Sequence, residues 1–134
     1  MGVKIKGKYA GELRYILTHQ TGEKIQTDAP LDNHGKGEAF SPTDLVAAAL
    51  GSCMLTIIAI RAETKSIKIG NPSFSVLKEM NTTPRRIKEI QVEISLPKEL
   101  NNAEKNYLET EARKCPVALS INSKIEQNIT FTYV

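Results

Sequence analysis

Aromatic residues are scarce in this sequence: it has no tryptophan, and three phenylalanines and four tyrosines make up 5% of its 134 residues. Proteins that hold single-stranded nucleic acid stack the bases on aromatic side chains, so this class is disfavoured. The net charge of +3 is also small compared with the clustered basic surface of a typical nucleic-acid-binding protein. We therefore expect no nucleic-acid partner.

The sequence also lacks an apolar stretch of the length that usually spans a membrane. Its longest uncharged run covers residues 45–60, whereas a membrane-spanning helix needs ~20 apolar residues. The first residues contain no hydrophobic signal-peptide core, and Lys6 stands where N-myristoylation requires Ser or Thr. We expect a cytoplasmic protein without a membrane partner, in which cysteines remain reduced.

Potential metal ligands are few, because the sequence has only two cysteines and two histidines. Cys53 and Cys115 are far apart in the chain, and no C-x₂-C pair is present. The spacing of His19 and His34 from these cysteines matches no common zinc site. We therefore expect no metal.

The length, together with 40% hydrophobic and 25% charged residues, is typical of one globular domain over residues 1–134. Alternating apolar and polar residues predict strands, and longer apolar or amphipathic stretches predict helices. The predicted strands are 3–6, 13–18, 24–27, 73–77, 87–96 and 125–134, and the predicted helices are 42–66 and 102–114. The order β-β-β-α-β-β-α-β indicates an α+β fold.

The first predicted helix has a well-defined start. Ser41 is a favourable N-cap, Pro42 suits the first helical position, and Asp44 completes a capping box. From residue 45 to residue 60 the helix is apolar on nearly all sides, so we expect it to be buried all round. A small domain rarely encloses a helix completely, so we expect a second subunit to cover part of it.

The two cysteines allow two interpretations. A thiolate can be oxidised by a peroxide to a sulfenic acid, which a second thiol converts to a disulfide if the two Cα atoms come within ~7 Å. Alternatively, free cysteine packs as a small hydrophobic residue, and Cys53 lies on an apolar helix. Cys115, at a helix end before Pro116, is open to either interpretation.

The segment 41–53, SPTDLVAAALGSC, followed some sixty residues later by Cys115-Pro116-Val117, resembles the OsmC/Ohr family of organic hydroperoxide reductases. The resemblance extends over essentially the whole chain. It implies an intertwined homodimer in which long central helices are buried inside and sheets wrap outside. It also implies an apolar substrate pocket near the subunit interface.

The resemblance further implies a thiol-dependent peroxidase that reduces organic hydroperoxides to alcohols. Cys53 would be the peroxidatic thiol and Cys115 the resolving thiol. The family needs no metal or organic cofactor, and an external dithiol recycles the disulfide. The alternative is a non-catalytic dimeric module on the same fold that binds a small apolar ligand.

Two further site residues follow from the resemblance, with one departure from the family pattern. Ohr-type members place a Glu directly after the helix-opening proline, where it holds a catalytic Arg from the N-terminal hairpins. Here that position is Thr43, the acid follows as Asp44, and the only Arg of the hairpin region is Arg14. By the resemblance, Arg14 would stabilise the Cys53 thiolate, and Asp44 would hold the Arg14 side chain. The alternative is that Arg14 is a solvated strand residue and that Asp44 only caps the helix. The departure places the chain nearer to OsmC-like branches than to true Ohr.

Overall fold

A computed structural model describes all residues, 1–134, and shows the predicted mixture of helices and sheets. The chain forms two compact units, residues 1–46 and residues 47–134. The predicted order of strands and long helices is confirmed, and the structure adds two short helices that the sequence did not predict. They are the 3₁₀ helix η1 (Leu31–Asn33) and the helix α3 (Pro116–Ser120).

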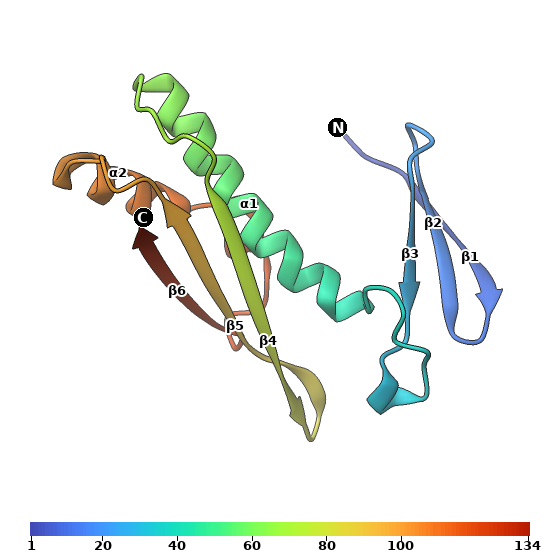
Figure 1. The fold of residues 1–134 in the computed structure, drawn as a ribbon. Coiled ribbons are helices and arrows are strands. Elements are labelled where there is room, and N and C mark those ends of the chain that lie inside the picture. Colours follow the sequence, from blue (N-terminus) through green and yellow to red (C-terminus); the bar gives the residue numbers. More distant parts are fainter. The chain divides into compact units, whose positions relative to one another are not determined.

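The N-terminal unit is an antiparallel meander (Figure 1). Its strands are β1 (Ile5–Gly11), β2 (Arg14–His19) and β3 (Lys24–Asp28). Glu12 and Leu13, between β1 and β2, both have positive φ angles of 53° and 62°. Two consecutive positive φ values define the tight turn whose twist matches that of a β-hairpin. The Tyr9 hydroxyl accepts a hydrogen bond from the Leu13 N–H and supports this turn.

The two faces of this meander differ in chemistry. Side chains alternate along a strand, so the register assigns every second residue to the same face. One face, here called the apolar face, carries Ile5, Tyr9, Tyr15, Leu17 and Ile25. The opposite face, here called the lysine face, carries Lys4, Lys6, Lys8 and Lys24. This pattern is typical of a sheet whose apolar face is covered by another element or another chain.

Helix α1 (Pro42–Thr64) begins where the sequence predicts and ends slightly earlier than predicted. The Asp44 N–H donates to Ser41 Oγ at 3.1 Å, and Asp44 Oδ2 accepts from the Ser41 N–H at 2.9 Å. These reciprocal bonds form a capping box, which satisfies donors that the first helical turn leaves unpaired.

The expectation that α1 is buried all round is wrong for this chain by itself. One side is buried within the C-terminal unit, at Leu50, Met54, Ile58 and Ala62. The opposite side is exposed along a stripe of mostly small residues, here called the exposed stripe: Ala49, Ser52, Thr56, Ala59 and Ile60. By length and composition alone α1 could cross a membrane, a criterion that buried core helices also meet. In this fold the helix packs its buried side on a sheet instead (Figure 1).

The C-terminal sheet has the order β4-β5-β6. Strands β4 (Ser73–Thr82) and β5 (Arg85–Leu96) form a long antiparallel hairpin, and β6 (Glu126–Tyr133) pairs in parallel with β5. Parallel neighbours need a crossover connection. Helices α2 (Asn102–Ala112) and α3 supply it, as Figure 1 shows.

Strand β5 provides the centre of the hydrophobic core. Four alternate residues along it are almost completely buried: Ile90, Val92, Ile94 and Leu96. Ile87 is also buried although it is out of phase with them, because a register shift near residues 79 and 80 of β4 adds one residue to β5. This side of the sheet faces the buried residues of α1 and α2, which positions both cysteines.

Candidate active site

The two cysteines of the C-terminal unit lie on different elements. Cys53 belongs to α1 and is partly exposed, whereas Cys115 is completely buried. Cys115 is the N-cap of α3, and its Sγ accepts a hydrogen bond from the Ala118 N–H at 3.3 Å. Pro116 begins α3 because a proline fits the first position of a helix. The predicted helix break before Pro116 is confirmed. The hydrogen bond from Ala118 fixes the position of the Cys115 sulfur.

The structure brings the two thiols together. Both cysteines are free, and the Cys53 side chain lies close enough to Cys115 to affect its pKa. Burial raises the pKa of the Cys115 thiol, and the neighbouring Cys53 raises it further, against the opposing effect of backbone N–H groups at Ala118 and Val117. Cys115 therefore retains its proton at neutral pH and can donate it toward Cys53.

This arrangement has the elements of a dithiol redox site. Cys53 is a partly exposed residue, and Cys115 is buried near it. An oxidant can therefore reach Cys53 first, and the second sulfur is already adjacent for disulfide formation. Cys115 is completely buried, whereas Cys53 is not fully enclosed.

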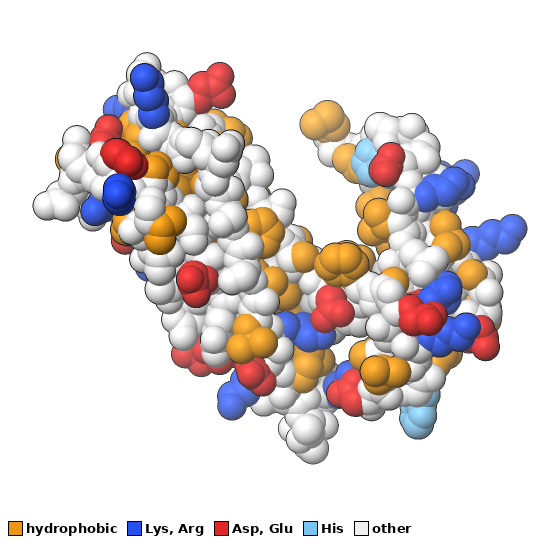
Figure 2. All heavy atoms as spheres, in the orientation of Figure 1, with side chains coloured by type: hydrophobic (Ala, Val, Ile, Leu, Met, Phe, Trp, Pro, Cys, Tyr) orange, Lys and Arg blue, Asp and Glu red, His pale blue; other side chains and the backbone are white.

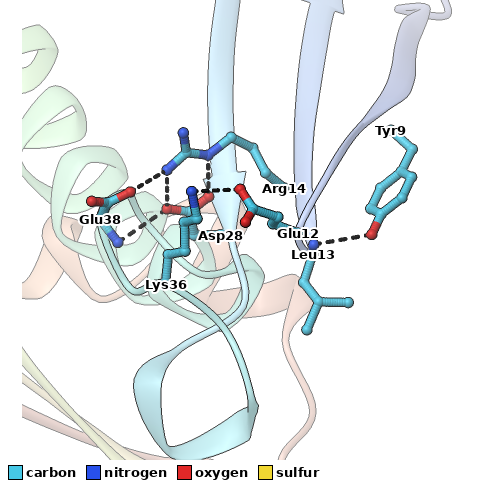
Figure 3. Close-up of polar contacts among 7 residues, drawn as sticks. All are labelled: Tyr9, Glu12, Leu13, Arg14, Asp28, Lys36 and Glu38. Atoms are coloured by element: carbon cyan, nitrogen blue, oxygen red, sulfur yellow. Dashed lines mark hydrogen bonds and ion pairs between the residues drawn. The ribbon is translucent and has the colours of Figure 1, made fainter.

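Arg14 lies in a cluster of ionised groups in the N-terminal unit (Figure 3). Its Nε donates to Asp28 Oδ1 at 2.6 Å and its Nη2 donates to Asp28 Oδ2 at 2.8 Å. The same Nη2 donates to Glu38 Oε1 at 2.9 Å. The Arg14 side chain is 24% exposed, so the interpretation as a solvated strand residue is wrong.

Asp28 is the anchor of this cluster. It is 1% exposed and lies directly opposite Arg14 in the pairing of β2 with β3. The Arg14 guanidinium, together with backbone N–H groups at Glu38 and Ala39, holds the pKa of the Asp28 carboxyl below its usual range. Burial acts in the opposite direction and is outweighed. Asp28 thus ties the loop after β3 to the hairpin.

A second ion pair closes the same loop. Lys36 Nζ lies 2.5 Å from Glu12 Oε2, which links the loop to the β1–β2 turn. Figure 3 shows the Glu12–Lys36 pair beside the Arg14 cluster. Asp28 and Glu38 were not among the predicted site residues. The alternation of 24–27 could have indicated that Asp28 continues a strand next to Arg14.

The predicted site residues therefore have different surroundings. Cys53 and Cys115 meet within the C-terminal unit, while Arg14 pairs with Asp28 and Glu38 in the N-terminal unit. The structure shows Asp44 in its capping role. No group of three or more His, Cys, Asp or Glu side chains is arranged to hold a metal ion.

Comparison with known proteins identifies the family. The model of the OsmC family, described as OsmC-like protein, matches residues 35–130. A search of curated proteins found no match. A solved structure from Psychrobacter arcticus 273-4, provisionally described as an osmotic stress induced and detoxification response protein, is 44% identical with a TM-score of 0.91, and the match covers 98% of this chain and 97% of that chain.

More distant solved structures share the fold. An organic hydroperoxide resistance protein OsmC from Legionella pneumophila is 20% identical with a TM-score of 0.81, covering 98% of this chain and 97% of that chain. The organic hydroperoxide resistance protein OhrB of Bacillus subtilis is 16% identical with a TM-score of 0.71, covering 98% of each chain. The chain belongs to the OsmC/Ohr family, as the sequence motifs indicated.

Proposed function

We propose that the protein is a thiol-dependent peroxidase that reduces organic hydroperoxides to alcohols. The observation that carries the proposal is that the partly exposed Cys53 lies near the buried Cys115 and influences its pKa. The names of the Legionella and Bacillus relatives, which refer to organic hydroperoxide resistance, support the same substrate class. The cytoplasm is the proposed location because its reducing conditions keep both thiols available.

The first step consumes the peroxide. The Cys53 thiolate attacks the terminal oxygen of the hydroperoxide, so that an S–O bond forms and the O–O bond breaks. The sulfur is oxidised to a sulfenic acid, and the peroxide is reduced to an alkoxide. The alkoxide takes the proton of Cys115 and leaves as the alcohol.

The second step resolves the sulfenic acid. The resulting Cys115 thiolate attacks Cys53 Sγ, an S–S bond forms, and hydroxide leaves and is protonated by solvent. An external dithiol then reduces the disulfide and returns both thiols. The raised pKa of Cys115 suits this sequence, since its proton stays in place until the alkoxide is released.

The proposed active form is a homodimer. The exposed stripe of α1 presents small and apolar side chains, and the apolar face of the N-terminal sheet exposes Ile5 and Ile25 at 61% and 50%. Figure 2 shows hydrophobic side chains at the surface of this unit. Such surfaces are typical of protein interfaces. Light scattering coupled to gel filtration should give about twice the chain mass; a monomer at all concentrations would contradict this part of the proposal.

We further propose that Arg14 assists the Cys53 thiolate and that Asp44 holds Arg14, as the family resemblance implies. A guanidinium near Cys53 would stabilise its thiolate and the transferring oxygen. Arg14→Lys keeps the charge opposite Asp28 but removes the two-pronged geometry. We expect slower oxidation of Cys53 in this variant, and in Asp44→Asn if its carboxylate acts beyond the cap.

The direct test follows the thiols during oxidation. The reduced protein is titrated with cumene hydroperoxide, and free thiols and the alcohol are measured. The parent should lose two thiols per peroxide, Cys115→Ser should stop at a sulfenic acid trapped by dimedone, and Cys53→Ser should consume none. Peroxide consumption by Cys53→Ser at the parental rate would refute the proposal and favour the ligand-binding alternative.

A further inference from the structure

The lysine face of the N-terminal sheet carries a group of charges that the proposed reaction does not use. Lys6 lies opposite Thr18, which in turn lies opposite Lys24, so two ammonium groups flank one neutral residue across the sheet. Lys4 and Lys8 extend the row along the first strand. Residues two apart on a strand are separated by ~6.6–6.8 Å. All four lysines are exposed.

These four positive charges are not neutralised locally. The ion pairs of the unit join Arg14 and Lys36 to carboxylates and leave the four lysines of this face without one. Two carboxylates lie beside Arg14 on this face, Asp28 and Glu38, and both are bound to its guanidinium. Glu23, the nearest acid in sequence to Lys24, lines a hollow on the apolar face.

Between the lysines this face carries the neutral residues Ile16, Thr18 and Gln26. An open hollow of about 380 Å³ at this face is lined by Lys4, Lys6, Thr18, His19, Gln20 and Gly22. No aromatic ring occupies the lysine face, because both tyrosines of the hairpin belong to the apolar face. Figure 2 shows Lys and Arg side chains projecting from the N-terminal unit.

We propose that the lysine face docks on an anionic phospholipid bilayer. A three-stranded sheet presents its lysines over a broad surface, which suits a plane of phosphate groups. Lysine is a flexible point charge that binds phosphates without fixed geometry, as attraction to a lipid surface requires. Binding to single-stranded nucleic acid usually adds stacked aromatic rings, and this face has none. The proposed contact is peripheral and involves no membrane-spanning segment.

The expected strength follows from the number of charges. Each Lys close to an anionic surface contributes about fivefold to the partition coefficient, so four contribute on the order of 10²–10³-fold. We would measure cosedimentation of the full chain with vesicles of phosphatidylcholine containing 30% phosphatidylglycerol, and with pure phosphatidylcholine. Binding should require the anionic lipid and weaken steeply between 50 and 500 mM salt.

Three quadruple variants separate the effect of the lysine face from that of net charge. Changing Lys4, Lys6, Lys8 and Lys24 to Gln should remove the binding, and changing the same four to Arg should retain it. The control changes four exposed lysines of the C-terminal unit to Gln, at positions 68, 88, 98 and 124, and alters net charge equally. Equal loss in both Gln variants, equal binding to pure phosphatidylcholine, or binding to an oligonucleotide but not to vesicles would each overturn the proposal. None of these measurements depends on peroxidase activity.

Discussion

Replacing Gly51 with valine tests the close contact between α1 and the C-terminal sheet. A Cβ atom at this position would lie 2.4 Å from Cδ2 and 2.5 Å from Cε2 of Phe74, and 3.0 Å from Cγ1 of Val76. Carbon atoms prefer ~3.5–4.0 Å, so the new side chain overlaps the Phe74 ring by about 1 Å or more. Either the Phe74 ring must turn away, or the helix and the sheet must move apart.

The expected cost combines two opposing effects. Overpacking a core contact costs typically ~1–3 kcal/mol, while replacing a helical Gly with Val returns a few tenths of a kcal/mol, roughly, from helix propensity. Phe74 is 36% exposed, so its ring has room to turn toward solvent. We therefore expect Gly51→Val to lower the free energy of unfolding by about 1–2 kcal/mol.

Urea denaturation measures this loss, and a double-mutant cycle assigns it to the contact. Phe74→Ala removes the clashing ring, so Gly51→Val should cost less in that background. Asn106→Val, at an exposed position within α2, controls for placing a β-branched residue in a helix. The reasoning is refuted if Gly51→Val and Asn106→Val shift the unfolding free energy equally, or if the cost is the same with and without the Phe74 ring.

Three further predictions concern the ionised groups, the thiols and the helix cap. Because the pKa of Asp28 is lowered in the folded state, its stabilising effect is present above the unfolded pKa and is lost as pH falls through the folded value; Asp28→Asn should flatten the acid limb of a stability-against-pH curve. Cys115→Ala should slow oxidation of Cys53 most for hydroperoxides with basic alkoxide leaving groups, as seen in stopped-flow rates; equal slowing for all peroxides would argue against proton donation. Ser41→Ala should destabilise the protein by about 0.5–2 kcal/mol in thermal unfolding, and a change within error would show that the cap is dispensable.

Local patterns in the sequence were sufficient to predict most elements of the fold. Ser41, Pro42 and Asp44 indicated the start of α1, and Pro116 indicated the end of α2, because capping and proline chemistry act over a few residues. Period-two alternation likewise predicted the strands. The parallel pairing of β6 with β5 was not predicted, since neither strand carries a local signal of its partner.

The candidate site could be predicted only in part. Motif resemblance identified Cys53 and Cys115, but their contact joins residues some sixty positions apart and depends on packing of the whole C-terminal unit. The Arg14–Asp28 pair depends on the register of β2 with β3, which the sequence alone does not give. The exposure of one side of α1 was also unforeseen, because hydrophobicity alone does not tell which apolar side chains a single chain covers. That both units form a single domain stays a prediction.

The unequal exposure of the two sulfurs determines how an oxidised protein would be regenerated. In a bond between Cys53 and Cys115, an incoming reductant can reach only the sulfur of Cys53, since the other is buried. The mixed disulfide with the reductant would therefore form on α1, and Cys115 would depart as the leaving thiolate. A thiol of raised pKa leaves slowly. Recovery by thiol–disulfide exchange would thus favour a strongly nucleophilic dithiol small enough to approach the helix surface.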